Sequence, residues 1–94
     1  MAEWTFLTNH AVVLVYLANH PQITARELAS SIGITERAVR KIIADLEAEA
    51  YISKAREGRG VRYSINSRLP LRHRTQKDKS VSKLLEALGW KEKK

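Results

Sequence analysis

The sequence has no cysteine, a single methionine, two prolines and four glycines among its 94 residues. The lack of cysteine excludes a disulfide framework, a thiolate zinc site and a cysteine nucleophile. No apolar run reaches the roughly 20 residues that a membrane-spanning helix needs, and the N-terminus lacks the basic-then-apolar order of a signal peptide. These absences favour a cytoplasmic protein with no membrane partner.

Histidines are also few. His10, His20 and His73 are scattered along the chain and have no acidic or cysteine partner at the spacing of metal ligands. The sequence shows no Ser/His/Asp arrangement, no glycine-rich phosphate loop and no pair of carboxylates suited to acid–base chemistry. We therefore predict no catalytic residue, no metal and no cofactor, and we do not expect an enzyme.

What the chain does have is positive charge, with 17 basic residues against 10 acidic ones, a formal net charge of +7 and a pI of about 10.1. Its hydrophobic fraction of 44% is that of a single globular domain. Residues 1–23 and 24–50 each sum to −1, residues 51–65 to +3 and residues 66–94 to +6. A polyanionic partner would therefore be attracted most strongly by the last two segments.

Apolar residues at helical spacing predict three helices before residue 51. The first is capped by Thr8 or Asn9 and runs to about Asn19, because Pro21 stops it. Its core-facing residues recur at helical spacing, as a buried stripe should.

The second and third helices follow closely. Thr24 and Glu27 form a capping box that starts the second helix, and Gly33 supplies the left-handed conformation that ends it. Thr35 caps the third helix, which continues to about Ala50. A helix, a short turn and a longer helix in this order are typical of a helix-turn-helix unit.

The segment after the third helix changes to strand periodicity. Residues 51–56 and 61–65 predict two strands around the turn at residues 58–60, and a third short strand near Ile23 is an alternative. We expect apolar residues of the hairpin to cover the core and basic residues to face solvent or a ligand. The first set is Ile52, Val61, Tyr63 and Ile65, and the second is Lys54, Arg56 and Arg62.

The predicted fold class is therefore α+β, a winged helix-turn-helix with a three-helix core, a two- or three-stranded wing and a C-terminal helix. Residues 1–66 would form a DNA-binding domain and residues 67–79 a basic connector. Residues 80–94 would hold the last helix, from about Ser80 to Leu88, as a candidate dimerisation element.

A helix-turn-helix places its second helix in the major groove, where exposed residues of the first two turns reach base edges. Here that helix covers about residues 35–50, and an arginine fork can bind both acceptors of a guanine. Pairing along the helix, such as Arg37 or Lys41 with Asp45, is the alternative to a DNA contact. The candidate base-reading residues are Thr35, Arg37, Arg40 and Lys41.

Contacts to the DNA backbone are expected near helix N-termini and from basic side chains around them. Arg59 at the hairpin tip is the strongest candidate for a phosphate or minor-groove contact, with a solvated loop arginine as the alternative. For Thr24, the alternative is a cap without a DNA contact. The complete set of backbone and wing candidates is Thr24, Arg26, Lys54, Arg56, Arg59, Arg62, Arg72 and Arg74.

Short motifs support this prediction, among them Leu-Thr-Asn-His at 7–10, Gly-Ile-Thr-Glu-Arg-Ala-Val at 33–39 and Leu-Pro-Leu-Arg-His at 69–73. Together they resemble small bacterial winged-helix transcriptional regulators, commonly grouped with the MarR-like proteins. The resemblance covers roughly residues 5–88 and implies double-stranded DNA as the partner, in transcription control. Larger MarR-like proteins bind small aromatic ligands between dimerisation helices that this short chain mostly lacks, so no small-molecule effector is predicted.

Two positions depart from that family. Such proteins usually have glycine where this chain has Ala50, which must either adopt a left-handed conformation or let the third helix run on. Gly60 stands where a basic residue is common, which would weaken the grip of the wing.

The apolar residues at the two chain ends exceed what a minimal winged-helix core needs. Pairing of the ends would bury them, either within one subunit or in a homodimer that reads a palindromic site. The candidate dimer contacts are Trp4, Phe6, Val81, Leu84, Leu85, Leu88 and Trp90. A winged-helix module that binds protein or RNA with the same surface is the alternative function.

Overall fold

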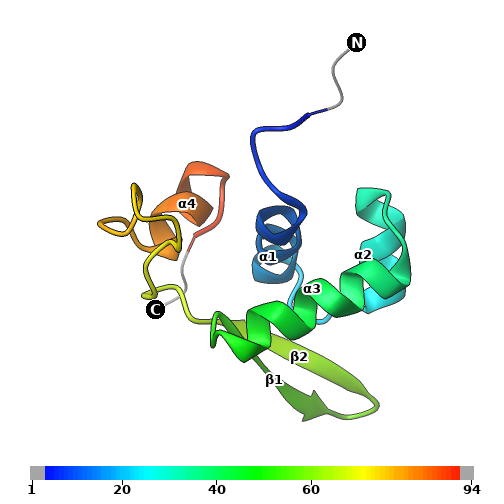
Figure 1. Cartoon of the computed structure of the whole chain (residues 1–94). Helices are drawn as coiled ribbons and strands as arrows, with labels where there is room; N and C mark the ends of the chain where they lie inside the picture. Colours follow the sequence, from blue (N-terminus) through cyan, green and yellow to red (C-terminus); the bar gives the residue numbers. More distant parts are fainter. Residues whose placement is uncertain (1–3, 92–94) are drawn as a thin grey trace.

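Three helices, a β-hairpin and a fourth helix follow one another along the chain in the computed structural model, which describes residues 4–91 (Figure 1). This order confirms the predicted α+β winged helix-turn-helix with an additional C-terminal helix. The elements are α1 (Asn9–Asn19), α2 (Ala25–Ile32), α3 (Glu36–Ala48), β1 (Ile52–Glu57), β2 (Gly60–Ile65) and α4 (Val81–Ala87).

Threonine hydroxyls cap the first three helices. Thr8 accepts a hydrogen bond from the third residue of α1, and Thr35 does the same for α3 at 3.0 Å. Thr24 forms the predicted capping box, because Glu27 N–H donates to its hydroxyl and the Glu27 carboxylate accepts from the Thr24 N–H, both at 3.0 Å. Gly33 then ends α2 in the left-handed conformation, with φ of 81°.

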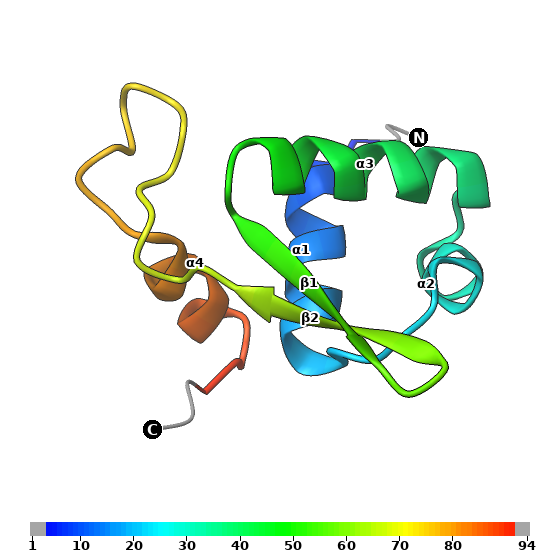
Figure 2. The same cartoon turned by 90° about the horizontal axis from the view of Figure 1, so that it is seen from below.

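The core lies where α3 crosses α1, with α2 beside the N-terminal end of α3 (Figure 2). α1 and α3 contribute apolar residues at helical spacing, and α2 adds a short buried stripe. The buried apolar residues are Val13, Leu14, Leu17, Leu28, Ala29, Val39, Ile42, Ile43, Leu46, Ile52, Val81 and Leu85.

α3 ends at Ala48, two residues earlier than predicted, and Ala50 adopts the left-handed conformation with φ of 66°. Ala50 N–H donates to the Glu47 carbonyl at 3.0 Å, and Tyr51 N–H donates to the Leu46 carbonyl at 2.9 Å. These two bonds satisfy carbonyls at the end of the helix and form a Schellman motif with alanine at the position that glycine usually fills.

The wing has two strands within the described part of the chain, paired antiparallel with Ile52 opposite Ile65 and Arg56 opposite Val61. The segment near Ile23 forms no third strand. Instead, one hydrogen bond joins it to the wing, from Tyr63 N–H to the Pro21 carbonyl at 2.8 Å. Proline has no N–H, so the ladder cannot continue through this residue.

The prediction that Val61 covers the core is wrong. Val61 pairs with Arg56 toward the free end of the hairpin, beyond the helices, and it is 36% exposed. The residues nearer the base behave as predicted, because Ile52 is buried and Tyr63 and Ile65 pack partly against the core.

The connector between β2 and α4 is a loop closed at its base by an isolated bridge between Pro70 and Ser80. Leu71 N–H donates to the Lys79 carbonyl at 2.9 Å, and Val81 N–H donates to the Leu69 carbonyl at 2.8 Å. The hydroxyl of Tyr51 also donates to the Pro70 carbonyl, which holds the loop against the end of α3. The connector therefore fixes α4 on its own domain.

This placement corrects two of the predicted dimer contacts. Val81 and Leu85 are 1% and 0% exposed within a single chain, so neither side chain is available to a partner. Trp4, Phe6 and Leu88 remain exposed, and Trp90 packs partly against the core. No helix within residues 4–91 is long and apolar enough to cross a membrane.

Candidate nucleic-acid interface

The recognition elements lie at one end of the molecule. In both Figure 1 and Figure 2, the free end of the hairpin lies toward α2 and the N-terminal end of α3, whereas the connector and α4 lie at the C-terminal end of α3. The side chains of Gln22 and Glu57 are hydrogen-bonded, which ties the hairpin to the loop between α1 and α2. This hydrogen bond brings the free end of the hairpin to the loop that precedes α2.

Arg37 is exposed in the first turn of α3, on the face that looks away from the apolar seam. No ion pair involves it within the described residues. Its guanidinium is therefore free to approach a base edge or a phosphate without first leaving a carboxylate.

Arg40 has a partner one turn earlier. Its Nε and Nη2 atoms both donate to Oε2 of Glu36, at 3.1 and 2.6 Å. The pair is exposed, so its contribution to stability is small, but the two bonds hold the guanidinium in one orientation.

Lys41 takes part in a three-residue contact. Its Nζ lies 3.5 Å from Oδ1 of Asp45, and Nε2 of His10 lies 2.8 Å from the other oxygen, Oδ2. The hydrogen bond with His10, followed by the positive charge of Lys41, lowers the pKa of Asp45 below its ordinary value despite partial desolvation. The pairing alternative is therefore present for Lys41, and Asp45 also links α3 to α1.

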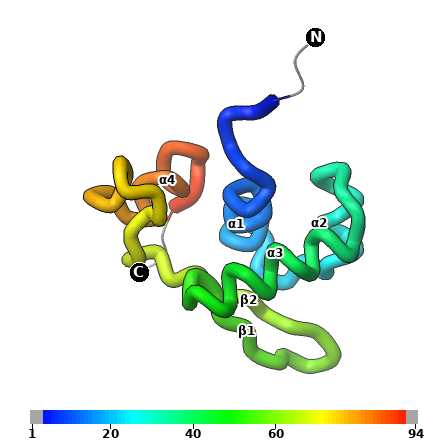
Figure 3. Tube along the Cα trace, viewed as in Figure 1, coloured from blue at the N-terminus to red at the C-terminus, as the bar shows by residue number. Residues whose placement is uncertain are grey.

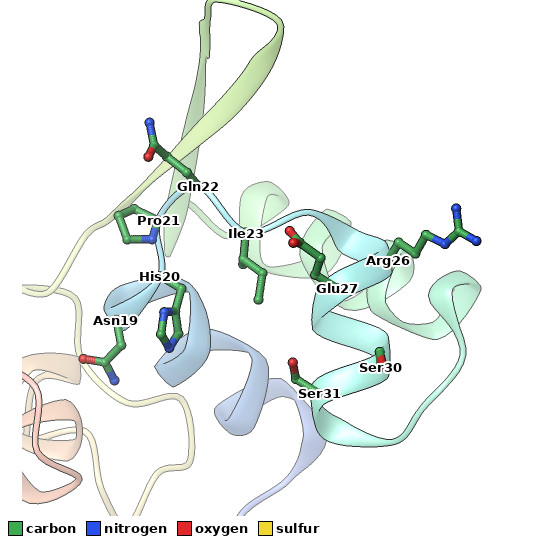
Figure 4. Close-up of a pocket in the computed structure, with 9 residues that line it drawn as sticks. All are labelled: Asn19, His20, Pro21, Gln22, Ile23, Arg26, Glu27, Ser30 and Ser31. Atoms are coloured by element: carbon green, nitrogen blue, oxygen red, sulfur yellow. The ribbon is translucent and has the colours of Figure 1, made fainter.

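Thr24 and Arg26 lie at the start of α2, next to a polar depression between α2 and the end of α1 (Figure 4). The Thr24 hydroxyl is already engaged in the capping box. Hydrogen bonds from the backbone N–H and the hydroxyl of Thr24 lower the pKa of the Glu27 carboxyl. The depression thus contains a carboxylate, which disfavours a phosphate there. Arg26 is the only lysine or arginine among the labelled residues, and its side chain points away from the depression (Figure 4).

The wing presents basic residues on two faces. Side chains two residues apart on a strand share a face, so Lys54 and Arg56 lie on the side of Ile52. Arg62 pairs with Ala55 and therefore lies on the other side. Nζ of Lys54 lies 3.6 Å from Oε1 of Glu47 in α3, and Nη1 of Arg62 lies 3.9 Å from Oε1 of Glu57.

The tip of the wing is formed by Gly58, with φ of 61°, and by Arg59. Neither Arg56 nor Arg59 takes part in an ion pair among residues 4–91. Both side chains are exposed, so the free end of the wing, which extends toward the N-terminal end of α3, carries unpaired positive charge.

Arg72 and Arg74 are exposed in the connector, which lies at the other end of α3. Three acidic residues lie at that end too: Asp45 and Glu47 in α3, and Glu49 as its C-cap. The structure therefore separates the predicted backbone contacts into a group around the wing and the helix N-termini and a second, distant group in the connector.

Sequence reasoning missed the contact between His10 and Asp45. These residues are 35 positions apart, and no local signal joins them. The pair between Glu36 and Arg40 was detectable from its four-residue spacing, but the sequence did not show which acid each base would choose. Within the described residues, no three histidine, cysteine or acidic side chains gather where they could hold a metal ion.

Comparison with known proteins adds one match. The model of a family described as an HTH domain matches residues 10–62, more than half of the chain, from the start of α1 to the third residue of β2. No curated protein matches the chain.

Proposed function

The chain belongs to the family of HTH domains, and from this premise we propose that it is a sequence-specific transcriptional regulator that inserts α3 into the major groove of double-stranded DNA. The observation that carries the proposal is the exposed face at the N-terminal half of α3, which carries Arg37, Arg40 and Lys41, together with a basic wing whose free end extends toward the same end of the helix. A DNA-binding regulator with this fold needs no catalytic group.

The three basic residues of α3 differ in what they must give up to bind DNA. Arg37 has no carboxylate partner within residues 4–91 and is the best candidate for bidentate contact with guanine. Arg40 is oriented by Glu36, which leaves its other terminal nitrogen for a base. Lys41 is shared with Asp45 and suits a phosphate, where a point charge is sufficient.

The wing supplies the neighbouring backbone contacts. Arg59 and Arg56 can follow the phosphates or enter the minor groove beside the site of α3, and Arg26 faces a phosphate at the start of α2. Arg72 and Arg74 lie in the connector, at the opposite end of α3 from the wing tip. We therefore propose that they contact the DNA that flanks the site.

We also propose a homodimer, which would read two half-sites roughly 34 Å apart on a palindromic operator. Grouping with the MarR-like regulators is part of the proposal and rests on the motifs at residues 7–10, 33–39 and 69–73. With DNA as the partner, the protein would act in the cytoplasm, where the bacterial chromosome lies.

Selection of bound duplexes from a random DNA pool tests the proposal directly. We expect one enriched sequence, and an affinity that falls roughly a thousandfold between 50 and 200 mM salt if six or so phosphates are contacted. A protein- or RNA-interaction module would enrich no duplex sequence. That outcome, together with equal binding of duplex DNA and an acidic protein, would contradict the proposal.

A further inference from the structure

The first turn of α3 carries a carboxylate among its basic residues. Glu36 is the first residue of the helix, directly after the cap Thr35, and Arg40 follows one turn later. This turn lies at the end of α3 that follows α2, away from the connector and α4 (Figure 3). A carboxylate weakens the attraction to phosphates, so binding to the DNA backbone does not account for a glutamate at this place.

The two side chains are joined through a single oxygen atom. Nε and Nη2 of Arg40 both donate to Oε2 of Glu36, and the Glu36 side chain makes no other hydrogen bond within residues 4–91. Oε1 of Glu36 is therefore free to accept a hydrogen bond. A guanidinium has five N–H groups, so three of those on Arg40 remain free to donate.

This pair therefore offers free donors beside a free acceptor on the exposed side of α3, with side chains that are 67% exposed for Arg40 and 42% for Glu36. The major-groove edge of a G·C base pair has the complementary order. Guanine presents the acceptors N7 and O6, and cytosine presents its N4 amino donor next to them. In an A·T pair, O4 of thymine would face Oε1 of Glu36, which brings two acceptors together without a proton between them.

We propose that Glu36 and Arg40 act as one unit that reads a single G·C base pair, with Arg40 donating to guanine and Oε1 of Glu36 accepting from N4 of cytosine. This inference rests on the proposed function and adds Glu36 to the residues that determine its specificity. The unit has no net charge, so it selects a base pair without strengthening the attraction to every sequence. Arg37 and Lys41, in the same two turns, supply the positive charge that brings α3 to DNA.

The alternative role of the pair is to stabilise α3. An exposed ion pair one turn apart contributes little to stability, however, and its effect on the guanidinium is larger. Two hydrogen bonds hold the Arg40 side chain in place before DNA arrives, and a side chain that is already ordered loses less freedom on binding.

Selection of duplexes from a random pool by the full chain and its variants tests the proposal. We expect a G·C pair at one position of the wild-type site, and a preference at that same position that falls about tenfold or more in both Glu36→Ala and Arg40→Ala. Arg37→Ala should relax a different position. Glu86→Ala is the matched control, because it removes the carboxylate of an exposed pair with Lys83 on α4 and should leave every position unchanged.

Modified bases locate the contacts on the wild-type protein. An inosine·cytosine pair has the major-groove edge of a G·C pair and lacks only the amino group of the minor groove, so the protein should bind it equally well. N4-methylcytosine replaces the amino hydrogen that faces the major groove with a methyl group. It should weaken binding of wild type by about tenfold and leave Glu36→Ala unaffected. An equal loss for both proteins would overturn the contact from Glu36.

The same experiments separate this inference from the proposed function. A random pool that yields no enriched sequence would contradict sequence-specific binding itself. An enriched site at which Glu36→Ala relaxes no position would overturn readout by Glu36 and leave the proposed function intact. Relaxation of two different positions by Glu36→Ala and Arg40→Ala would overturn the shared base pair, because each residue would then read its own.

Discussion

Nε2 of His10 lies 2.8 Å from Oδ2 of Asp45 and joins the start of α1 to the C-terminal half of α3. Asp45 holds Lys41 with its other oxygen, so one carboxylate connects a helix of the core to a candidate DNA contact. The two halves of α3 therefore differ. The first half presents arginines to solvent. The second half is joined to α1 through Asp45 and His10 and to the wing through Glu47 and Lys54, and its Asp45 also pairs with Lys41 of the same helix.

Replacement of Asp45 by asparagine should reduce stability in a pH-dependent way. The folded-state pKa of Asp45 is lowered by the hydrogen bond with His10 and by Lys41, so its contribution is complete above the ordinary pKa of 3.8 and is lost as the pH falls through the lower folded value. We expect the stability difference between wild type and Asp45→Asn to be present above the ordinary pKa of 3.8 and to shrink as the pH falls below it. Urea unfolding at several pH values measures it. Glu49→Gln removes a neighbouring carboxylate outside this contact, and an identical pH profile for both variants would contradict the assignment.

Thr24→Ala should lower the unfolding free energy by about 1 kcal/mol, because it removes the hydroxyl that caps α2. Thr24→Ser keeps the hydroxyl and should remain close to wild type. Since the hydroxyl is occupied by the capping box, the affinity of the folded Thr24→Ala protein for DNA should be unchanged. If the folded Thr24→Ala protein binds DNA more weakly than wild type, Thr24 contacts a phosphate.

Ala50→Gly should stabilise the protein by about 1 kcal/mol, because Ala50 has φ of 66° and glycine adopts this conformation without a Cβ clash. The side chain is exposed, so little burial is lost. Ala44→Gly is the opposing control: it places glycine inside α3 and should destabilise by about 1 kcal/mol. Thermal unfolding of both variants gives the comparison, and destabilisation by Ala50→Gly would show that the left-handed alanine carries no strain.

Arg40→Ala should relax sequence preference at one position of the DNA site, since one wrong base pair in a site typically costs roughly 1–3 kcal/mol and this residue would no longer discriminate against it. Glu36→Gln tests the role of the partner. Loss of this carboxylate frees Arg40 and removes a negative charge from the surface, so binding to scrambled DNA should strengthen while selectivity falls. Competition assays with scrambled duplex measure both. Uniform weakening on all sequences by Arg40→Ala would exclude base readout by this residue.

Arg59→Ala and Arg72→Ala should differ in their dependence on duplex length. Arg59 lies at the wing tip, which extends toward the N-terminal end of α3, so its loss should weaken binding to a short half-site of any sequence and reduce the salt slope by about one. Arg72 lies in the distant connector, and its loss should be felt only on longer duplexes. Equal effects on the short duplex would contradict the separation of the two basic groups.

The elements of this fold could be predicted because their signals are local. Thr24 and Glu27, three residues apart, form the capping box of α2. Gly58 begins the turn between two strands in which apolar and polar residues alternate. Even the conflict at Ala50 was visible, since an alanine directly after a helix must either extend it or turn left-handed. The identity of the base-reading residues remains a prediction, because it depends on a DNA surface that the chain alone does not contain.

The sequence by itself determined where the first three helices begin, where the chain turns, and that its positive charge lies mainly in the wing and beyond. Each of these depends on a few consecutive residues and their backbone hydrogen bonds. Only the tertiary structure decided that His10 binds Asp45, that Val61 lies beyond the core, that Val81 and Leu85 are buried within one subunit, and that the connector lies away from the wing. These outcomes depend on the angles and distances at which the elements pack, and no short stretch of sequence specifies them.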